Sequence, residues 1–133
     1  MFRSDTTNAI KEGIQKGYYE SGKLKYETLY KSNLKTGIQK SYYENGKLKY
    51  EISFKNDVKN GIQRGYFPNG KLRAETPYKN NRVDGIKKTY YENSKLRFET
   101  SFKDGKKSGE KKFYNENGEL EKTIIYKDDK EVK

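Results

Sequence analysis

Apolar and polar residues alternate along this chain with the period of a β-strand. The segment 48–54, LKYEISF, alternates over its whole length, which predicts a strand and not a helix. Before it stand two aromatic residues, Tyr42 and Tyr43, and the polar turn 44–47, ENGK. A Gly after Asn suits the left-handed position of a three-residue hairpin loop with a type I turn and a G1 bulge. The pattern therefore predicts a β-hairpin, with 55–60 as the turn to the next one.

The hairpin pattern recurs every 24 residues, without insertion, from glycines at the same position of each unit: Gly13, Gly37, Gly61, Gly85 and Gly109. A fixed period of this length marks a stacked repeat architecture. We expect an all-β fold: an elongated, twisted single antiparallel sheet of about ten strands, built from five tandem β-hairpin repeats. The repeats span 13–36, 37–60, 61–84, 85–108 and 109–133, and residues 1–12 form an N-terminal half-repeat or cap.

Two departures from the pattern carry predictions of their own. Ser94 replaces the turn glycine of the fourth repeat, so that turn is either strained or built differently. The fifth repeat is more polar than the others, as a capping repeat needs to be. Its polar replacements are Glu110, Asn115, Glu119 and Lys122.

Side chains are expected to divide between a buried face and an exposed face. Because Tyr42 should lie opposite Leu48, the buried face is predicted to hold Ile38, Tyr42, Leu48, Tyr50 and Phe54. The exposed face is predicted to hold Gln39, Ser41, Tyr43, Lys47, Lys49 and Glu51.

An exposed column of rings flanked by basic residues is a candidate recognition surface, since aromatic and basic side chains are enriched in binding hot spots. Its rings are Tyr19, Tyr43, Phe67 and Tyr91, and its cations are Lys23, Lys25, Lys47, Lys49, Lys71, Arg73, Lys95 and Arg97. The alternative is that the rings only stack along the sheet. The recurring Glu27, Glu51, Glu75 and Glu99 are interpreted as a solvated charge ladder, because no second carboxylate converges on them.

Composition narrows the chemistry. The 133 residues include no Cys and no His, which removes thiol nucleophiles, the usual zinc ligands and the commonest general base; we expect neither a cofactor nor catalysis. The net charge is +11, and it is concentrated in residues 1–108, which contain 24 basic and 12 acidic residues. No stretch approaches the roughly 20 apolar residues of a membrane span.

The repeat GxxxxYYxxGKLxxExxYK, seen at 13–31 and with Phe54 for the last Tyr at 37–55, resembles the bacterial variant of the MORN repeat. The resemblance covers about residues 13–133. It implies a binding role without catalytic residues, in proteins often described as antitoxin- or immunity-like components or as secreted surface proteins. Neither the sequence nor the resemblance indicates the compartment. We expect the chain as given to be soluble, either in the cytoplasm or secreted after removal of a leader.

These features are compatible with four functions. The first is a protein-interaction module whose partner presents an acidic surface, with a second copy of the chain as another candidate partner. The second is binding of anionic lipid headgroups through the basic residues. Nucleic acid is disfavoured, because no recognised binding signature is present. An enzyme is the weakest of the four.

Overall fold

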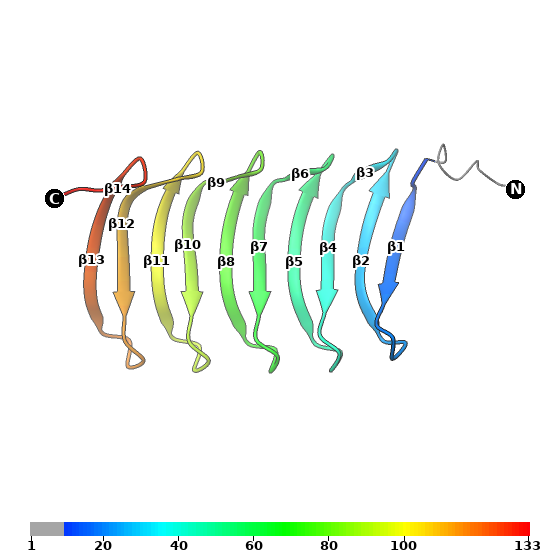
Figure 1. Cartoon of the computed structure of the whole chain (residues 1–133), viewed down its shortest axis with the longest axis horizontal. Coiled ribbons are helices and arrows are strands. Elements are labelled where there is room, and N and C mark those ends of the chain that lie inside the picture. Colours follow the sequence, from blue (N-terminus) through cyan, green and yellow to red (C-terminus); the bar gives the residue numbers. More distant parts are fainter. Residues whose placement is uncertain (1–9) are drawn as a thin grey trace, which may run out of the picture.

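The computed structural model describes residues 10–133, and these residues form one open antiparallel sheet with no helix (Figure 1). The predicted all-β repeat fold is confirmed. Ten longer strands make up five hairpins that follow one another along the long axis, with four two-residue strands in the connections. The strands are β1 Gly13–Tyr18, β2 Leu24–Lys31, β3 Leu34–Lys35, β4 Gly37–Tyr42, β5 Leu48–Lys55, β6 Val58–Lys59, β7 Gly61–Tyr66, β8 Leu72–Lys79, β9 Arg82–Val83, β10 Gly85–Tyr90, β11 Leu96–Lys103, β12 Lys106–Tyr114, β13 Leu120–Lys127 and β14 Lys130–Glu131.

Each hairpin closes at one edge of the sheet through the predicted three-residue loop. In the second repeat the Gly46 N–H donates to the Tyr43 carbonyl at 2.9 Å, and the Tyr43 N–H donates to the Lys47 carbonyl at 2.8 Å. Gly46 has a φ of 86°, the left-handed value that the loop requires. Ser94 adopts the same turn at a φ of 72°, so the fourth repeat keeps the geometry and accepts the strain.

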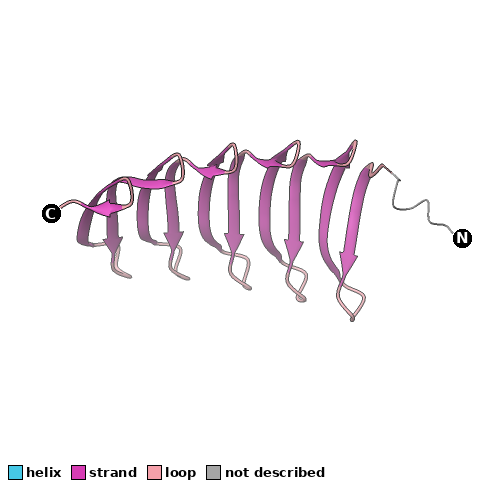
Figure 2. Ribbon diagram, turned by 45° about the horizontal axis from the view of Figure 1, so that its top comes forward, coloured by secondary structure: helices cyan, strands magenta, loops and turns pink. Residues whose placement is uncertain are grey.

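The hairpins are joined at the opposite edge by a second kind of turn (Figure 2). Asn56 and Asp57 have φ of 49° and 68°, as the central residues of a two-residue type I′ turn do. The Asp57 N–H donates to the Lys35 carbonyl at 2.8 Å, and its Oδ1 accepts from the Lys35 N–H at 2.7 Å. Each such turn is thereby bonded to the preceding connection. Asn33, Asn81 and Asp129 make the same pair of bonds.

A β-bulge changes how the side chains divide between the faces. Tyr42 pairs with Leu48 as predicted, but Ser41 pairs with Tyr50, so Lys49 is an extra residue in β5. The bulge reverses the alternation after it. One face, which we call the isoleucine face, holds Ile38, Lys40, Tyr42, Leu48, Glu51, Ser53 and their equivalents. The other, the lysine face, holds Gln39, Ser41, Lys49, Tyr50, Ile52, Phe54 and their equivalents.

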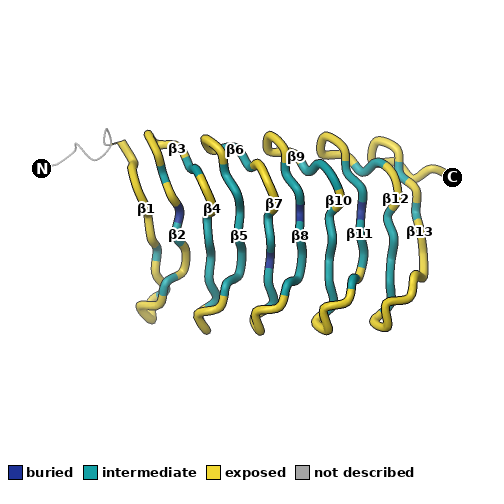
Figure 3. Tube along the Cα trace, turned by 180° about the vertical axis from the view of Figure 1, so that it is seen from behind, coloured by how far each residue is buried: buried dark blue, intermediate teal, exposed yellow. Residues whose placement is uncertain are grey.

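The predicted grouping was therefore wrong for the residues beyond the bulge. Tyr50 and Phe54 lie on the face opposite to Tyr42 and Leu48, and Glu51 lies with Tyr42. The predicted buried face was wrong as well, because no apolar side chain among residues 10–133 is buried (Figure 3). A single layer of strands covers neither of its own faces.

The most enclosed side chains are threonines in the middle of the lysine face. Thr28, Thr76 and Thr100 retain 5%, 8% and 3% of their accessible surface. The isoleucine face is more open, since its isoleucines at positions 14, 38, 62 and 86 are 44% to 60% exposed. Because so little apolar surface is buried, hydrogen bonds between successive hairpins contribute much of the stability of the sheet.

The proposed half-repeat at 1–12 lies largely outside the described residues. At the other end, β13 is mostly exposed and pairs only with β12 and the short β14. The polar replacements of the fifth repeat thus lie at the terminal hairpin of the sheet.

Candidate functional site: the lysine face

The isoleucine face carries both signs of charge in a regular pattern. Glu51 lies between two basic residues, paired with Lys40 on one side and Arg64 on the other. Among the described residues, Arg64 Nε and Glu75 Oε2 form an ion pair at 3.2 Å. Lys16, Lys88 and Lys112 flank the equivalent glutamates in the same way. In the middle of the strands the basic and acidic side chains of this face thus alternate. Next to the type I′ turns the same face also holds basic residues without a paired glutamate: Lys31, Lys55, Lys79 and Lys103.

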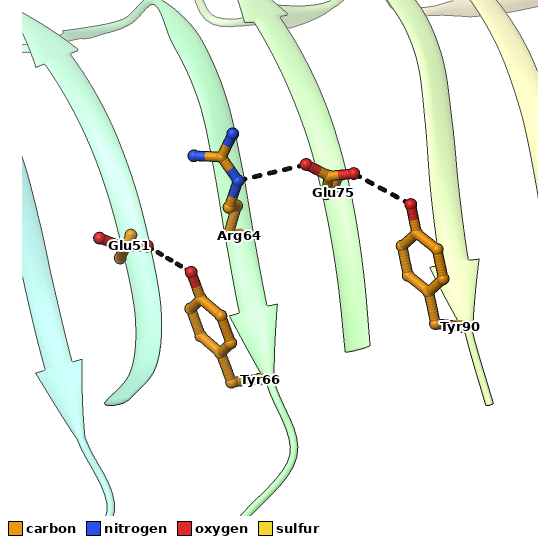
Figure 4. Close-up of polar contacts among 5 residues, drawn as sticks. All are labelled: Glu51, Arg64, Tyr66, Glu75 and Tyr90. Carbon is orange, nitrogen blue, oxygen red and sulfur yellow. Dashed lines mark hydrogen bonds and ion pairs between the residues drawn. The ribbon is translucent and has the colours of Figure 1, made fainter. Parts of the chain in front are cut away.

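The glutamates of that face also link each hairpin to the next (Figure 4). Tyr42 donates its phenol proton to Glu27 Oε1 at 2.8 Å, and Tyr90 donates to Glu75 Oε1 at 3.0 Å. Burial raises the pKa of Tyr42 to about 12, with the hydrogen bond to Glu27 as the next cause. The glutamates are half-buried acceptors of these bonds and not a freely solvated ladder, and they lie on the face opposite to Lys25, Lys49, Arg73 and Arg97.

The lysine face has a different composition: its cations lie over aromatic rings. Near the type I′ turns, lysines lie over a ring of the following repeat. Lys35 Nζ is 5.2 Å from the centroid of Phe54, and Lys59 Nζ is 4.9 Å from that of Tyr78. Near the hairpin loops, Lys49 lies 5.6 Å from the Tyr43 centroid. Further pairs of this kind are Lys11–Tyr30, Lys25–Tyr19, Arg97–Tyr91 and Lys107–Tyr126. Each contact holds a cation in place over a ring.

Carboxylates are segregated from these cations. Within β1 to β12 the acidic residues are Glu27, Glu51, Glu75, Glu99 and Glu110, and the register places all of them on the isoleucine face. The first acidic residue on the lysine face is Glu121 in the terminal strand β13, where the other repeats have Lys or Arg. In β1 to β12 the lysine face therefore carries cations without a carboxylate, whereas the isoleucine face carries both signs of charge.

Lys111 shows the crowding of positive charge on this face. Its Nζ lies 4.9 Å from the Phe98 centroid and 5.1 Å from that of Phe113. Burial lowers the pKa of Lys111, and the positive charges of Lys107 and Lys87 lower it further. Its neighbours repel its charge, so an anion placed here would stabilise it.

The rings predicted to form a recognition column lie at the strand ends that the hairpin loops join. Tyr19, Tyr43 and Tyr91 are half-buried, and each donates its hydroxyl to a carbonyl of the next repeat at 2.6 Å. The acceptors are the carbonyls of Tyr42, Tyr66 and Tyr114. Phe67, at the same position in the third repeat, has no hydroxyl to donate. These rings link successive loops as well as supporting the cations.

The predicted cations divide into two groups. Lys25, Lys49, Arg73 and Arg97 lie on the lysine face. Lys23, Lys47, Lys71 and Lys95 are exposed in the hairpin loops. In that second group Lys47 Nζ donates to the Asn69 carbonyl of the next loop at 3.1 Å, and Lys95 Nζ donates to the Asn117 carbonyl at 3.3 Å. Sequence reasoning found these residues but missed the row of Lys11, Lys35, Lys59 and Lys107, because only the register places it on the same face.

A cavity of about 190 Å³ opens on the lysine face at the third repeat. It is lined by Tyr50, Gln63, Gly65, Arg73, Ala74, Thr76 and Lys87. The sequence signal for it is Ala74, which stands where the first, second and fourth repeats have Tyr26, Tyr50 and Phe98.

No cluster of three or more potential metal ligands from Cys, Asp or Glu occurs within residues 10–133. The same residues contain no helix long and apolar enough to cross a membrane.

Comparison with known families identifies the repeat. A family model described as MORN repeat variant matches five segments of the chain, 11–32, 35–56, 59–80, 83–104 and 107–128. The first four matched segments start just before a hairpin, the fifth starts within β12, and all five end in the type I′ turn after the hairpin. No curated protein matches the chain.

Proposed function

Because the chain belongs to the MORN repeat variant family, whose repeats generally bind proteins or membranes, we propose that it is a non-enzymatic protein-interaction module. In this proposal the lysine face docks on an acidic surface of a partner protein. The partner supplies the carboxylates that this face lacks.

The observation that carries the proposal is the separation of charge between the two faces. In the middle of the strands, cations on the isoleucine face alternate with glutamates, so the fields of these charges largely cancel at a distance. Cations on the lysine face have no such neighbours in β1 to β12 and add to one positive field. A field of one sign over a broad surface steers an oppositely charged partner and orients it.

The rings prepare these cations for binding. Lys35, Lys49 and Lys59 each lie within 6 Å of a ring centroid, so part of their rotational freedom is already lost before a partner arrives. Ordering a long side chain at an interface otherwise costs about 0.5–1.5 kcal/mol. The preorganised lysines of this face therefore favour a specific contact over a diffuse one.

A protein partner is favoured over a membrane by where the apolar side chains lie. Peripheral membrane binding combines an inserted apolar surface with cations around it on the same side. Here the exposed isoleucines at 14, 38, 62 and 86 lie on the face opposite to the cations that rest over aromatic rings. A lipid surface could use only one of the two faces at a time.

The antitoxin- or immunity-like role implied by the sequence resemblance is a specific form of this proposal. In that form the lysine face would cover an acidic surface of a toxin. Interaction at a cell surface is another form, and both use the same residues.

The test compares two double variants with the same change in net charge. Lys35→Gln with Lys59→Gln removes cations from the lysine face, and Lys40→Gln with Lys88→Gln removes them from the isoleucine face. The probe is poly-L-glutamate, with binding measured at several salt concentrations. We expect the lysine-face pair to weaken binding about tenfold, on the order of 1.4 kcal/mol, and the other pair much less. Binding should also weaken as salt rises.

Equal losses in the two pairs would contradict the proposal, because net charge alone would then explain binding. Vesicles of phosphatidylserine and phosphatidylcholine provide the comparison with lipid. Face-dependent binding to these vesicles, without binding to poly-L-glutamate, would replace the protein partner by a membrane.

A further inference from the structure

The third repeat interrupts a row of aromatic rings that runs along the lysine face. The rings come from the position after the bulged residue: Tyr26, Tyr50 and Phe98. In the third repeat this position is Ala74, and its partner across the hairpin is Gly65. Two of the smallest residues thus face each other where a ring lies in the neighbouring repeats, and the cavity of about 190 Å³ results.

No ring is present at position 74, and the Arg73 side chain extends to the preceding repeat. Its guanidinium carbon lies 5.7 Å from the Tyr50 centroid, and Nη2 donates to the Tyr50 hydroxyl at 3.3 Å. In the fourth repeat, by contrast, Arg97 lies over Phe98 of its own repeat at 5.8 Å. A Cβ on Gly65 would come within 2.9 Å of Arg73 Nη2, so a larger residue there would require the guanidinium to shift.

The cavity presents positive charge without a carboxylate among its lining residues. Arg73 has five N–H donors in a fixed fork, and the contact with Tyr50 uses one nitrogen. Lys87 enters from the next hairpin, at a position that is Gln15, Gln39 and Gln63 in the first three repeats. The fork of an arginine matches a carboxylate with two parallel hydrogen bonds, and a nearby ammonium adds a third donor.

We propose that this cavity is the anchoring pocket for an acidic side chain, Asp or Glu, on a peptide segment of the partner. The inference rests on the proposed function. It assigns the largest contribution to the binding free energy to the third repeat, midway along the array. The carboxylate lies between Arg73 and Lys87, and the stem of the side chain occupies the space that a ring fills in the other repeats. The space of about 190 Å³ is open to solvent and has room for several waters, which a side chain displaces.

Gln63 extends the recognition to the peptide backbone. Its Oε1 is buried and has no hydrogen-bond donor among the described residues; Gln39 Oε1 is in the same position one repeat earlier, but only Gln63 lines this cavity. A buried acceptor without a donor costs free energy, on the order of 1–3 kcal/mol. A peptide brings backbone N–H groups next to its acidic side chain, and one of them can meet the Gln63 carboxamide. A free carboxylate has no such group.

Two substitutions test the pocket with residues that other repeats already carry. Ala74→Tyr introduces the tyrosine that the second repeat has at the equivalent position, Tyr50, and fills the cavity. Lys87→Gln introduces the glutamine that the third repeat has at the equivalent position, Gln63. Lys112→Gln is the matched control, because it makes the same change of charge on the isoleucine face, away from the cavity. The probe is a fluorescein-labelled peptide of alternating Glu and Gly, compared with its Gln and Gly counterpart by fluorescence anisotropy. Thermal unfolding verifies that each variant is folded.

We expect Ala74→Tyr to weaken binding of the Glu peptide at least tenfold, since it removes the pocket, and Lys87→Gln about five- to tenfold. Lys112→Gln should change it about twofold, the loss of one charge on the opposite face. Equal affinity for the Gln peptide would overturn the pocket. If Ala74→Tyr binds like the unsubstituted chain while Lys35→Gln with Lys59→Gln binds weakly, the pocket is refuted and the lysine face stands. If none of these substitutions weakens binding, both proposals fall.

Discussion

Tyr66 donates its phenol hydroxyl to the carboxylate of Glu51, which belongs to the preceding hairpin (Figure 4). The contact spans 15 residues of sequence and crosses from one repeat to the next. It recurs as Tyr42–Glu27, Tyr90–Glu75 and Tyr114–Glu99, at 2.8, 3.0 and 3.1 Å. In a sheet that buries no apolar side chain among residues 10–133, such bonds become a substantial part of the interface between repeats.

Tyr66→Phe should therefore destabilise the array although the ring remains. A hydrogen bond to a charged group contributes about 1.5–3 kcal/mol, and partial exposure reduces this, so we expect a loss of about 1 kcal/mol in the free energy of unfolding. Urea denaturation followed by circular dichroism provides the measurement. The control is Tyr18→Phe, at the same position in the first hairpin, where the side chain is 59% exposed. A loss as large in the control would show that the hydroxyl bond to Glu51 has no special role.

The same hydrogen bonds predict an alkaline transition. Burial and the bonded glutamates raise the pKa of Tyr42 and of Tyr66 from 10.0 to about 12. The folded chain then keeps protons that the unfolded chain releases near pH 10, so this contribution is complete below pH 10 and is lost as the pH rises toward 12. Urea midpoints measured at successive pH values should fall over this range. The double variant Tyr42→Phe with Tyr66→Phe separates this effect from lysine titration: it should fall less steeply, and an identical slope would contradict the prediction.

The repeat fold could be predicted from sequence because its determinants are local. Glycine spacing gave the period, and the turn 44–47 gave the loop type and the pairing of Tyr42 with Leu48. The bulge at Lys49 could not be predicted, since nothing in LKYEISF marks one residue as extra in the ladder. One unrecognised residue then reversed the assignment of Tyr50, Glu51 and Phe54, because side chains alternate with a period of two.

The candidate site was predicted in part for the same reason. Lys25, Lys49, Arg73 and Arg97 stood out because they recur beside aromatic residues. The absence of carboxylates around them depends on the bulge, which moves the adjacent glutamates to the isoleucine face. The hydroxyl bonds of Tyr19, Tyr43 and Tyr91 join residues 23 apart and have no signature in the sequence beyond the repeat itself.

The loop of the fourth repeat offers a stabilising substitution. Ser94 holds a φ of 72° in the position that Gly46 occupies at 86°. A left-handed conformation costs a residue with a Cβ about 1 kcal/mol relative to glycine, so Ser94→Gly should raise the free energy of unfolding by about 0.5–1 kcal/mol. The reverse change, Gly46→Ser, is the matched control and should lower it by a similar amount. No gain in the first variant would mean that Ser94 is stabilised by contacts that offset its strain.

The third repeat lacks one link that its neighbours have, and this can be restored. Tyr43 and Tyr91 each donate to a carbonyl of the next repeat at 2.6 Å, whereas Phe67 stands at the same position without a hydroxyl. Phe67→Tyr should place a hydroxyl at the Tyr90 carbonyl and stabilise the array by about 0.5–1.5 kcal/mol, the net contribution of one hydrogen bond. Tyr43→Phe makes the opposite change one repeat earlier and should cost about the same. Thermal and urea unfolding measure both variants. If Tyr43→Phe destabilises while Phe67→Tyr gives no gain, the link depends on more than the hydroxyl, and the loop of the third repeat differs from the others in its fit to the next loop.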